Sequence, residues 1–256
     1  MATSYGTMSS TVTDGLVIYY DALNPKSYSG QGNTWTNFVD GSYPLSKKGS
    51  QSPTFPQYNP DGWFGFTGGA STLNYSRFET HNVRGFTSMS IEVWWRIQVT
   101  AAAPGNDAYL QSTYGSAGPD SNLYGWQSYA TMIIPNEKNI SYTFYTTGSG
   151  NPAISANNYN ADHNIIKGKW HHTVATFDYT TQTSRGYFDG VFKATASGST
   201  ASLNGISGGS LRIGVRSDVQ GYSFFGDIAV IKIYERALSA SEVEKNYNAL
   251  RRRFGI

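Results

Sequence analysis

The stretch Met89-Ser-Ile-Glu-Val-Trp-Trp-Arg-Ile97 alternates between two sets of side chains. One set is apolar and recurs at every second position: Ile91, Val93, Trp95 and Ile97. The residues between them are Glu92, Trp94 and Arg96. A period of two is typical of a β-strand, because successive side chains of a strand point to opposite faces. We therefore predict a central strand here, with one face in a hydrophobic core.

Similar short runs occur on both sides of this stretch. They are Leu16 to Tyr20, Ala130 to Ile134, Ile140 to Tyr145, Trp170 to Phe177, Gly186 to Phe192, Leu211 to Val215 and Asp227 to Tyr234. The pair Asp189-Gly190 predicts a two-residue β-hairpin, since both central positions of that turn need a positive φ. Many short strands separated by turn residues indicate an all-β sandwich or barrel.

One helix is predicted, near the end of the chain. Ser239-Ala-Ser-Glu242 is typical of a capping box, in which the serine and the glutamate satisfy backbone N–H groups of the first turn. An apolar stripe follows it: Val243, Tyr247, Leu250 and Phe254. Residues 21–62 and 101–129 are rich in turn-forming residues, and we expect loops there.

Composition limits the function. The 256 residues include no Cys, which excludes disulfides, Cys-based zinc sites and a thiol nucleophile. The net charge of +2 disfavours nucleic acid as a partner, because no broad positive field is present. Residues 1–13 contain neither a basic residue nor an apolar run, so we expect no signal peptide, and no stretch is long and apolar enough for a membrane span. We expect a flexible N-terminal arm over residues 1–13 and a single domain over residues 14–256.

Three stretches resemble a known family. They are Lys167 to Asp178 with Tyr187-Phe-Asp-Gly190, Met89 to Arg96, and Leu211-Arg-Ile-Gly214 with Phe225 to Ser239. Their motifs and order are similar to those of the laminin-G-like members of the concanavalin-A-like lectin/glucanase superfamily. The resemblance spans about residues 85 to 245 and implies a concanavalin-A-like jelly roll, a two-sheet antiparallel β-sandwich with one short C-terminal helix.

Within such a sandwich, the largest side chains of the motifs are expected to be structural. We predict that Trp95, Trp170 and Phe188 are largely buried and that Trp170 fills the core between the sheets. His171 and His172 are adjacent on a strand and should point to opposite faces, so they cannot chelate one ion together.

A second resemblance is narrower. Gly15 to Tyr28, Thr34-Trp35 and Asn246 to Ile256 are similar to small laminin-G-like proteins of tailed bacteriophages. This resemblance implies a virion surface protein made in the host cytoplasm, as a capsid decoration or accessory protein. The alternative is a tail-associated receptor-binding module that recognises host glycan. The implied partners are other virion proteins of the capsid or tail and a host surface glycan, and a homo-oligomer is left open.

Catalysis is disfavoured by the distribution of acidic residues. Glycoside hydrolysis needs two carboxyl groups across the scissile bond, and the laminarinase-like relatives take them from a Glu-x-Asp strand that this sequence lacks. We predict a non-catalytic protein, with a glycan hydrolase as the least favoured alternative. We predict no metal site or other cofactor; calcium is disfavoured because the candidate loops carry single acids: Asp107, Asp120, Asp162 and Asp218.

Binding is the remaining function. Five aromatic residues of the 101–129 region form the candidate ligand-binding site: Tyr109, Tyr114, Tyr124, Trp126 and Tyr129. Aromatic rings stack on sugars and also serve protein recognition, and the alternative is that these rings pack on the sheet. We expect the arm to contact a neighbouring molecule, so deletion of residues 2–12 should leave the domain folded but weaken its retention on particles.

Overall fold

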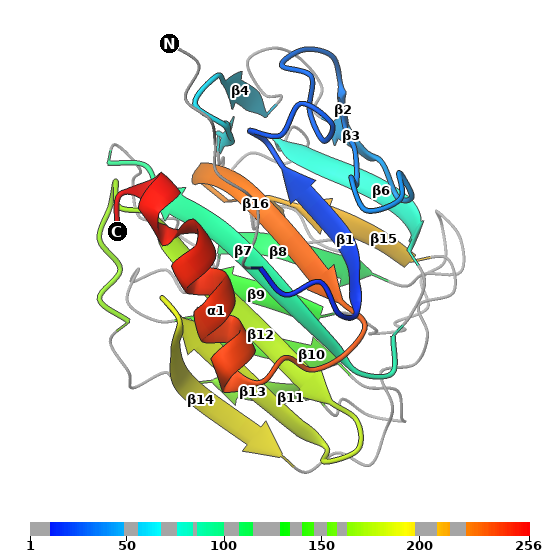
Figure 1. Cartoon of the computed structure of the whole chain (residues 1–256), viewed down its shortest axis with the longest axis vertical. Helices are drawn as coiled ribbons and strands as arrows, with labels where there is room; N and C mark the ends of the chain where they lie inside the picture. Colours follow the sequence, from blue (N-terminus) through cyan, green and yellow to red (C-terminus); the bar gives the residue numbers. More distant parts are fainter. Residues whose placement is uncertain are drawn as a thin grey trace.

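The computed structural model is a sandwich of two antiparallel sheets (Figure 1). It describes residues 11–48, 56–67, 76–83, 86–99, 108–114, 129–133, 140–145, 153–157, 163–197, 209–215 and 224–256. One helix follows the last strand and lies across one sheet. The predicted all-β sandwich with a single short C-terminal helix is confirmed.

The first sheet has eight strands and contains the stretch from which the fold was predicted. Their order is β14 (Val191–Ser197), β13 (Thr183–Phe188), β12 (His171–Asp178), β7 (Met89–Ile97), β16 (Gly226–Tyr234), β5 (Trp63–Phe66) and β4 (Gln57–Asn59), with β1 (Leu16–Asp21) also paired to β16. Strands β7 and β16 lie at its centre and are buried on both faces over most of their length.

The pairing of β7 with β16 contains a β-bulge. Asp227 lies opposite Arg96, and Ile228 lies opposite Trp95. The next pair joins Trp94 to Val230, so Ala229 is an extra residue of β16. The carbonyl of Ala229 accepts a hydrogen bond from the N–H of Ala22, at 3.0 Å. The bulge therefore leaves that carbonyl satisfied.

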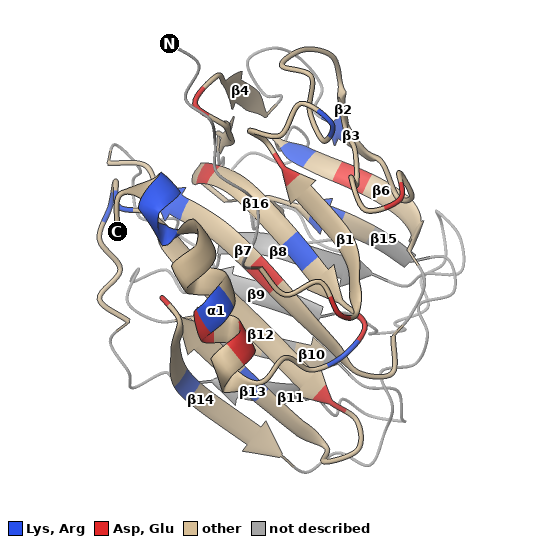
Figure 2. Ribbon diagram, in the orientation of Figure 1, with Lys and Arg blue, Asp and Glu red and all other residues tan. Residues whose placement is uncertain are grey.

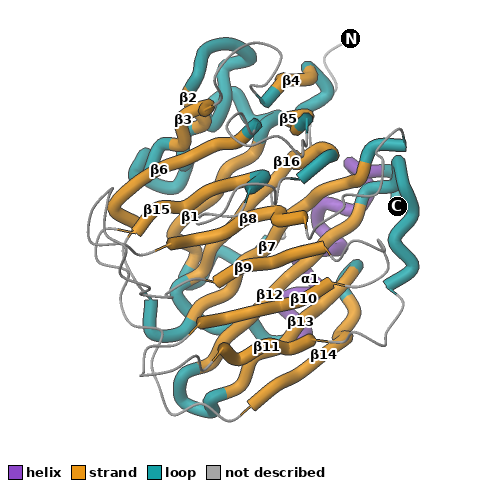
Figure 3. The backbone as a smooth tube through the Cα atoms, turned by 180° about the vertical axis from the view of Figure 1, so that it is seen from behind, coloured by secondary structure: helices purple, strands orange, loops and turns teal. Residues whose placement is uncertain are grey.

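The second sheet also has eight strands and faces the viewer in Figure 3. Their order is β11 (Ala153–Asn157), β10 (Ile140–Tyr145), β9 (Tyr129–Ile133), β8 (Ala108–Tyr114), β15 (Gly209–Ile213), β6 (Arg77–Val83), β3 (Leu45–Lys48) and β2 (Thr34–Trp35). Strands β2, β3 and β4 lie within residues 21–62, and β8 lies within residues 101–129. The prediction of loops there is wrong for these strands, which are too short, or too close to Gly and Pro, to show a clear alternation.

The core between the sheets consists largely of aromatic rings. Trp35, Phe64 and Phe78 are fully buried, and Phe64 lies 4.8 Å from Trp35 and 4.7 Å from Phe78 between ring centroids. Trp95 and Phe188 are buried in the same cluster, as predicted. Aromatic pairs of this geometry stabilise a core beyond the apolar area that they bury.

The outer face of the first sheet, the face turned away from the second sheet, is covered along part of its length. Helix α1 (Ala240–Leu250) and the 3-10 turn η1 (Arg251–Phe254) lie over it (Figure 1). The capping box is present, with the N–H of Glu242 donating to Ser239 Oγ and the N–H of Ser239 donating to the Glu242 carboxylate. This covering buries Trp94, which the alternation places on the face opposite Trp95.

Trp170 is buried, but not between the sheets. It packs on the outer face with Trp63 and Phe254, whose ring centroids lie 5.7 and 4.8 Å from its own. The prediction of burial is confirmed and its assignment to the core between the sheets is wrong. The reason is that the C-terminal segment gives the sheet a second buried face, which the strand pattern does not reveal.

The hairpin between β13 and β14 has the predicted turn, with a φ of 49° at Asp189 and 79° at Gly190. On the neighbouring strand, His171 packs against Trp95 and Phe188 in the core, while His172 packs against Trp94 and Tyr247 under the helix. The two histidines therefore point to opposite faces, as predicted.

Candidate functional site

The five aromatic residues predicted to bind a ligand do not form one loop. Tyr109 and Tyr114 lie near opposite ends of strand β8, and Tyr129 begins strand β9. Tyr124 and Trp126 lie outside the described residues. Their assignment to a long loop is wrong for the three that are described, because β8 and β9 pair in the second sheet. That any of them binds a ligand stays a prediction.

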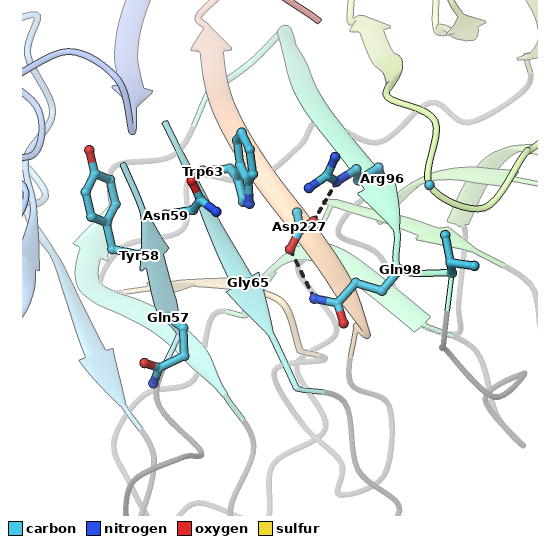
Figure 4. Close-up of a pocket in the computed structure, with 10 residues that line it drawn as sticks. Gln57, Tyr58, Asn59, Trp63, Gly65, Arg96, Gln98 and Asp227 are labelled. Atoms are coloured by element: carbon cyan, nitrogen blue, oxygen red, sulfur yellow. Dashed lines mark hydrogen bonds and ion pairs between the residues drawn. The ribbon is translucent and has the colours of Figure 1, made fainter. Parts of the chain in front are cut away.

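A pocket of about 570 Å³ opens on the outer face of the first sheet. Its side chains come from the neighbouring strands β4, β5, β16 and β7 and from the segments that follow β7 and precede β12 (Figure 4). The lining residues are Gln57, Tyr58, Asn59, Trp63, Gly65, Arg96, Gln98, Val99, Gly168 and Asp227. The set combines one indole, one phenol, three amides and one acid–base pair.

The acid–base pair lies at the centre of the pocket. Arg96 and Asp227 face each other across β7 and β16, and Arg96 Nε donates to Asp227 Oδ2 at 2.6 Å. Gln98 Nε2 donates to the other carboxylate oxygen at 3.2 Å. A Cβ atom at Gly65 would come within 3.2 Å of Asp227 Oδ1, so the glycine on β5 leaves the room that this carboxylate occupies.

The guanidinium of Arg96 is also held by two aromatic rings. Its Cζ lies 4.6 Å from the ring centroid of Trp63 and 4.9 Å from that of Trp170, within the range of a cation–π contact. The side chain of Arg96 is 26% exposed, so part of the guanidinium still faces the pocket. Figure 4 shows Arg96 and Trp63 side by side, with the Asp227 carboxylate next to them.

Trp63 is a half-buried ring at the start of β5. The residue before it, Gly62, has a φ of 95°, and its carbonyl accepts a hydrogen bond from Arg253 Nη2 at 3.0 Å. Arg253 Nη1 also bonds Asp21, at 2.8 Å, so the C-terminal turn η1 fixes the position of this corner. The covering segment thus supports one wall of the pocket.

A second polar cluster lies on the same outer face, beneath α1. It consists of Glu92, Lys232, His172 and Asn246, and all four are fully buried; we call it the covered cluster. Lys232 Nζ donates to Glu92 Oε1 at 2.9 Å, and His172 Nε2 lies 3.4 Å from the same oxygen. In Figure 2 an acidic segment of β7 and a basic segment of β16 lie side by side, next to the helix in this view.

The helix completes the covered cluster. Asn246 Nδ2 donates to Glu92 Oε2 at 2.7 Å, and Trp94 Nε1 donates to Oε1 at 3.3 Å. Burial by itself raises the pKa of Glu92, but the Lys232 ammonium and the nearby His172 outweigh it and hold that pKa at about 2. The carboxylate is therefore ionised at neutral pH, and no solvent reaches it.

The cluster also holds the beginning of the described chain. The N–H of Val12 donates to Asn246 Oδ1 at 2.7 Å, and its carbonyl accepts from Tyr234 OH at 3.2 Å. Val12 is buried against Val243 and Leu238. The arm predicted over residues 1–13 thus contacts its own domain at Val12, and residues 1–10 lie outside the described part.

The chemistry open to the pocket is binding through stacking and hydrogen bonds. Among the described residues that line it, Asp227 is the only acidic one, and each of its oxygens accepts a hydrogen bond, from Arg96 or from Gln98. Within the described ranges, no three His, Asp or Glu side chains gather as a metal site. No helix of the described chain is long and apolar enough to cross a membrane.

Sequence reasoning missed this pocket. The alternation places Arg96 on the face opposite the core. The position of Asp227 opposite Arg96 depends on the register of β16 and on its bulge, which the alternation does not reveal. Trp63 lies directly after Pro60-Asp-Gly62, which was the end of a predicted loop. A signal was available in the outward-facing Arg96 beside two tryptophans, Trp94 and Trp95.

The sequence and fold of this chain are similar to those of known proteins. The laminin-G-type family model described as the concanavalin A-like lectin/glucanases superfamily matches residues 68–244, more than half of the chain. The chain belongs to this superfamily. No curated protein matches the sequence.

Solved structures share the lectin-like fold at low sequence identity. Trypanosoma rangeli sialidase aligns with a TM-score of 0.59 and 15% identity, over 95% of this chain and 34% of its own. The binding domain of botulinum neurotoxin serotype D aligns with a TM-score of 0.58 and 12% identity, over 92% of this chain and 52% of its own. The chain thus spans about a third of the sialidase and about half of the toxin domain.

Proposed function

We propose that this domain binds a saccharide in the pocket on the outer face of the first sheet. The observation that carries the proposal is the pairing, in one open pocket, of the half-buried indole of Trp63 with the polar groups of Arg96, Gln98 and Asn59. Sugar rings present an apolar C–H face and a rim of hydroxyls, so they match an aromatic ring beside amide and guanidinium groups. The lectin-like fold is consistent with this role.

The pocket is built before a ligand arrives. The Arg96–Asp227 pair is held at 2.6 Å and the Trp63 corner is fixed through Arg253. A site whose side chains are already ordered loses little conformational entropy on binding. This favours recognition by preformed contacts over a large rearrangement.

Binding without hydrolysis is the second part of the proposal. Cleavage of a glycosidic bond needs a second carboxyl group across the bond from the first. Among the described lining residues only Asp227 carries a carboxyl group, and its two oxygens accept hydrogen bonds from Arg96 and Gln98. The direct check is a reducing-sugar assay on whichever glycan binds, in which release abolished by Asp227→Asn would contradict this part.

The experiment for binding is a glycan array followed by titration calorimetry with Trp63→Ala. We expect the variant to lose at least about tenfold in affinity, because the stacking surface is removed. The matched control is Phe192→Ala, since Phe192 is 49% exposed on the edge strand β14, away from the pocket. Near-UV circular dichroism verifies that both variants remain folded. An unchanged affinity in folded Trp63→Ala would place the ligand elsewhere.

The biological setting is a second proposal, based on the resemblance of residues 15–28, 34–35 and 246–256 to small laminin-G-like phage proteins. It places the domain on a virion surface, as a capsid decoration protein held by other virion proteins. A tail-associated receptor-binding module is the alternative, and the pocket favours it because a receptor-binding module needs a glycan site. Immunogold labelling of intact particles distinguishes capsid from tail, and absence of label from both would contradict the setting.

A further inference from the structure

Arg96, in the pocket, has N–H donors that its ion pair with Asp227 does not use. Its Nε atom is used by Asp227, at 2.6 Å. Among the described residues, no acceptor forms a hydrogen bond with Nη1 or Nη2 of Arg96, although its side chain is only 26% exposed. The two terminal nitrogens of a guanidinium donate in parallel, with the spacing of two carboxylate oxygens.

The plane of this guanidinium is fixed. Trp63 and Trp170 contact it at 4.6 and 4.9 Å, and Asp227 bonds its Nε edge. Asp227 is itself held by Gln98 and is 6% exposed. Asp227 is therefore a positioning residue for Arg96, since it is buried and both its oxygens are hydrogen-bonded within the protein. A preorganised fork of this kind favours a planar, two-oxygen acceptor.

The rest of the pocket offers both a donor and an acceptor. Asn59 Oδ1 accepts from the N–H of Asp61 at 2.9 Å, which leaves its amide NH₂ group to donate. Gln98 donates through Nε2 to Asp227 and retains one carbonyl oxygen. A ligand that fits this inventory brings acceptors near Arg96 and a ring near Trp63.

The charge around the pocket permits an anion. Among the lining residues that the structure describes, Arg96 and Asp227 are the only charged ones, and they neutralise each other. Gly168, which lines the pocket, is flanked in the chain by Lys167 and Lys169, so added charge at that rim is positive. The carboxylate of Asp227 is bonded to Nε of Arg96.

We propose that the pocket is selective for carboxylated sugars, with the sugar carboxylate bound by Nη1 and Nη2 of Arg96 and the sugar ring packed against Trp63. The proposal rests on the proposed function of the pocket and adds the class of saccharide. It predicts that the acid, rather than the sugar ring alone, determines affinity.

The test uses matched acid and ester probes. Methyl β-D-glucuronide and the methyl glycoside of N-acetylneuraminic acid are each compared with their own methyl esters by NMR titration, with the indole N–H signal of Trp63 as reporter. Each ester keeps the ring and removes the charge and the symmetrical pair of oxygens. We expect at least one acid to bind about tenfold or more tightly than its ester.

Variants then assign the difference to Arg96. Arg96→Lys keeps the charge but removes the two-nitrogen fork, and we expect it to bring the acid down to the affinity of the ester. Asp227→Asn should reduce the acid-to-ester ratio, a readout that a purely structural role would not change. Arg185→Lys, a conservative change on β13, is the control and should keep the ratio.

The outcomes separate the two proposals. Equal affinity of acid and ester in the wild-type protein, with the Trp63 signal shifting, would overturn carboxylate selectivity and leave saccharide binding in place. If no sugar of the array or of this panel shifts the Trp63 signal, both proposals fail. A tenfold preference that persists in folded Arg96→Lys would contradict the assignment to the fork.

Discussion

The same two strands carry two acid–base pairs on one face of the sheet, and the described segments of the chain cover only one of them. Glu92 lies opposite Lys232 beneath helix α1, and both are fully buried. Arg96 lies opposite Asp227 in the open pocket, four residues further along β7. The strands exchange roles between the two pairs, since β7 supplies the acid in one and the base in the other.

The difference shows what burial requires of a charged pair. Under the helix, Asn246, Trp94 and His172 surround Glu92, because no water can solvate its remaining lone pairs. In the pocket, the two terminal nitrogens of Arg96 need no protein partner, because solvent or a ligand reaches them. The same kind of pair is therefore structural in one half of the face and available for binding in the other.

The largest expected effect comes from breaking the covered pair. Glu92→Gln keeps the shape of the side chain but leaves the Lys232 ammonium buried without a counter-ion, and we expect the free energy of unfolding to fall by about 3–5 kcal/mol. Urea denaturation measures this loss.

The matched change in the open half is Asp227→Asn. We expect a loss of only about 1 kcal/mol, because Arg96 remains hydrated when its partner is neutralised. Similar losses in both variants would show that the pocket half is as dry as the covered half.

Low pH is expected to reduce the stability that the covered cluster contributes. Because Glu92 has a pKa of about 2 in the folded protein against an ordinary value of 4.5, it stabilises the fold above about pH 4.5. That contribution is lost as the pH falls from 4.5 towards 2. Glu92→Gln should therefore unfold with a flatter dependence on pH over this window, measured as urea midpoints at several pH values.

Glu242 is the control for the acid prediction. The hydrogen bond from Arg236, with further help from Ser239, lowers its pKa also to about 2, but its side chain is 29% exposed. Solvent screens such a pair, so Glu242→Gln should change the pH dependence less than Glu92→Gln does. A larger effect of Glu242→Gln would contradict the view that the covered cluster dominates acid stability.

The last prediction concerns the start of the chain, where we expect a small effect. Deletion of residues 2–12 removes the buried Val12 and the partner of Asn246 Oδ1, whereas deletion of residues 2–10 keeps both. We expect the longer deletion to be less stable than the shorter one by about 1–2 kcal/mol. Equal urea midpoints would mean that the contacts of Val12 with the covered cluster do not stabilise the fold.

Much of the fold could be predicted from the sequence, because alternation and turn chemistry are local. Strand β7, the Asp189-Gly190 turn and the Ser239 capping box all depend on neighbouring residues and are confirmed. The second buried face was not predictable in this way, because α1 returns to the sheet from the far end of the chain. Trp170 and Glu92 were therefore placed without the helix that buries them.

The candidate site could not be predicted for a related reason. Its lining residues are spread from Gln57 to Asp227, and only strand order and register bring them together. The aromatic cluster of residues 109–129 was favoured because it is contiguous in sequence. Closeness in sequence does not predict a binding site well in a sheet whose neighbouring strands are far apart in the chain.

The extra residue at Ala229 has a consequence for how the outer face is assembled. Glu92 and Arg96 are four positions apart, an even spacing that keeps both on one face of β7. Asp227 and Lys232 are five positions apart, a spacing that in a regular strand would turn one of them inward. The bulge shifts the phase of β16 by one residue between them. Deletion of Ala229 would place Asp227 and Lys232 four positions apart, a spacing at which a regular strand keeps both charges on the outer face without a bulge. With the natural spacing of five, the bulge at Ala229 is what keeps both charges of β16 on the same face.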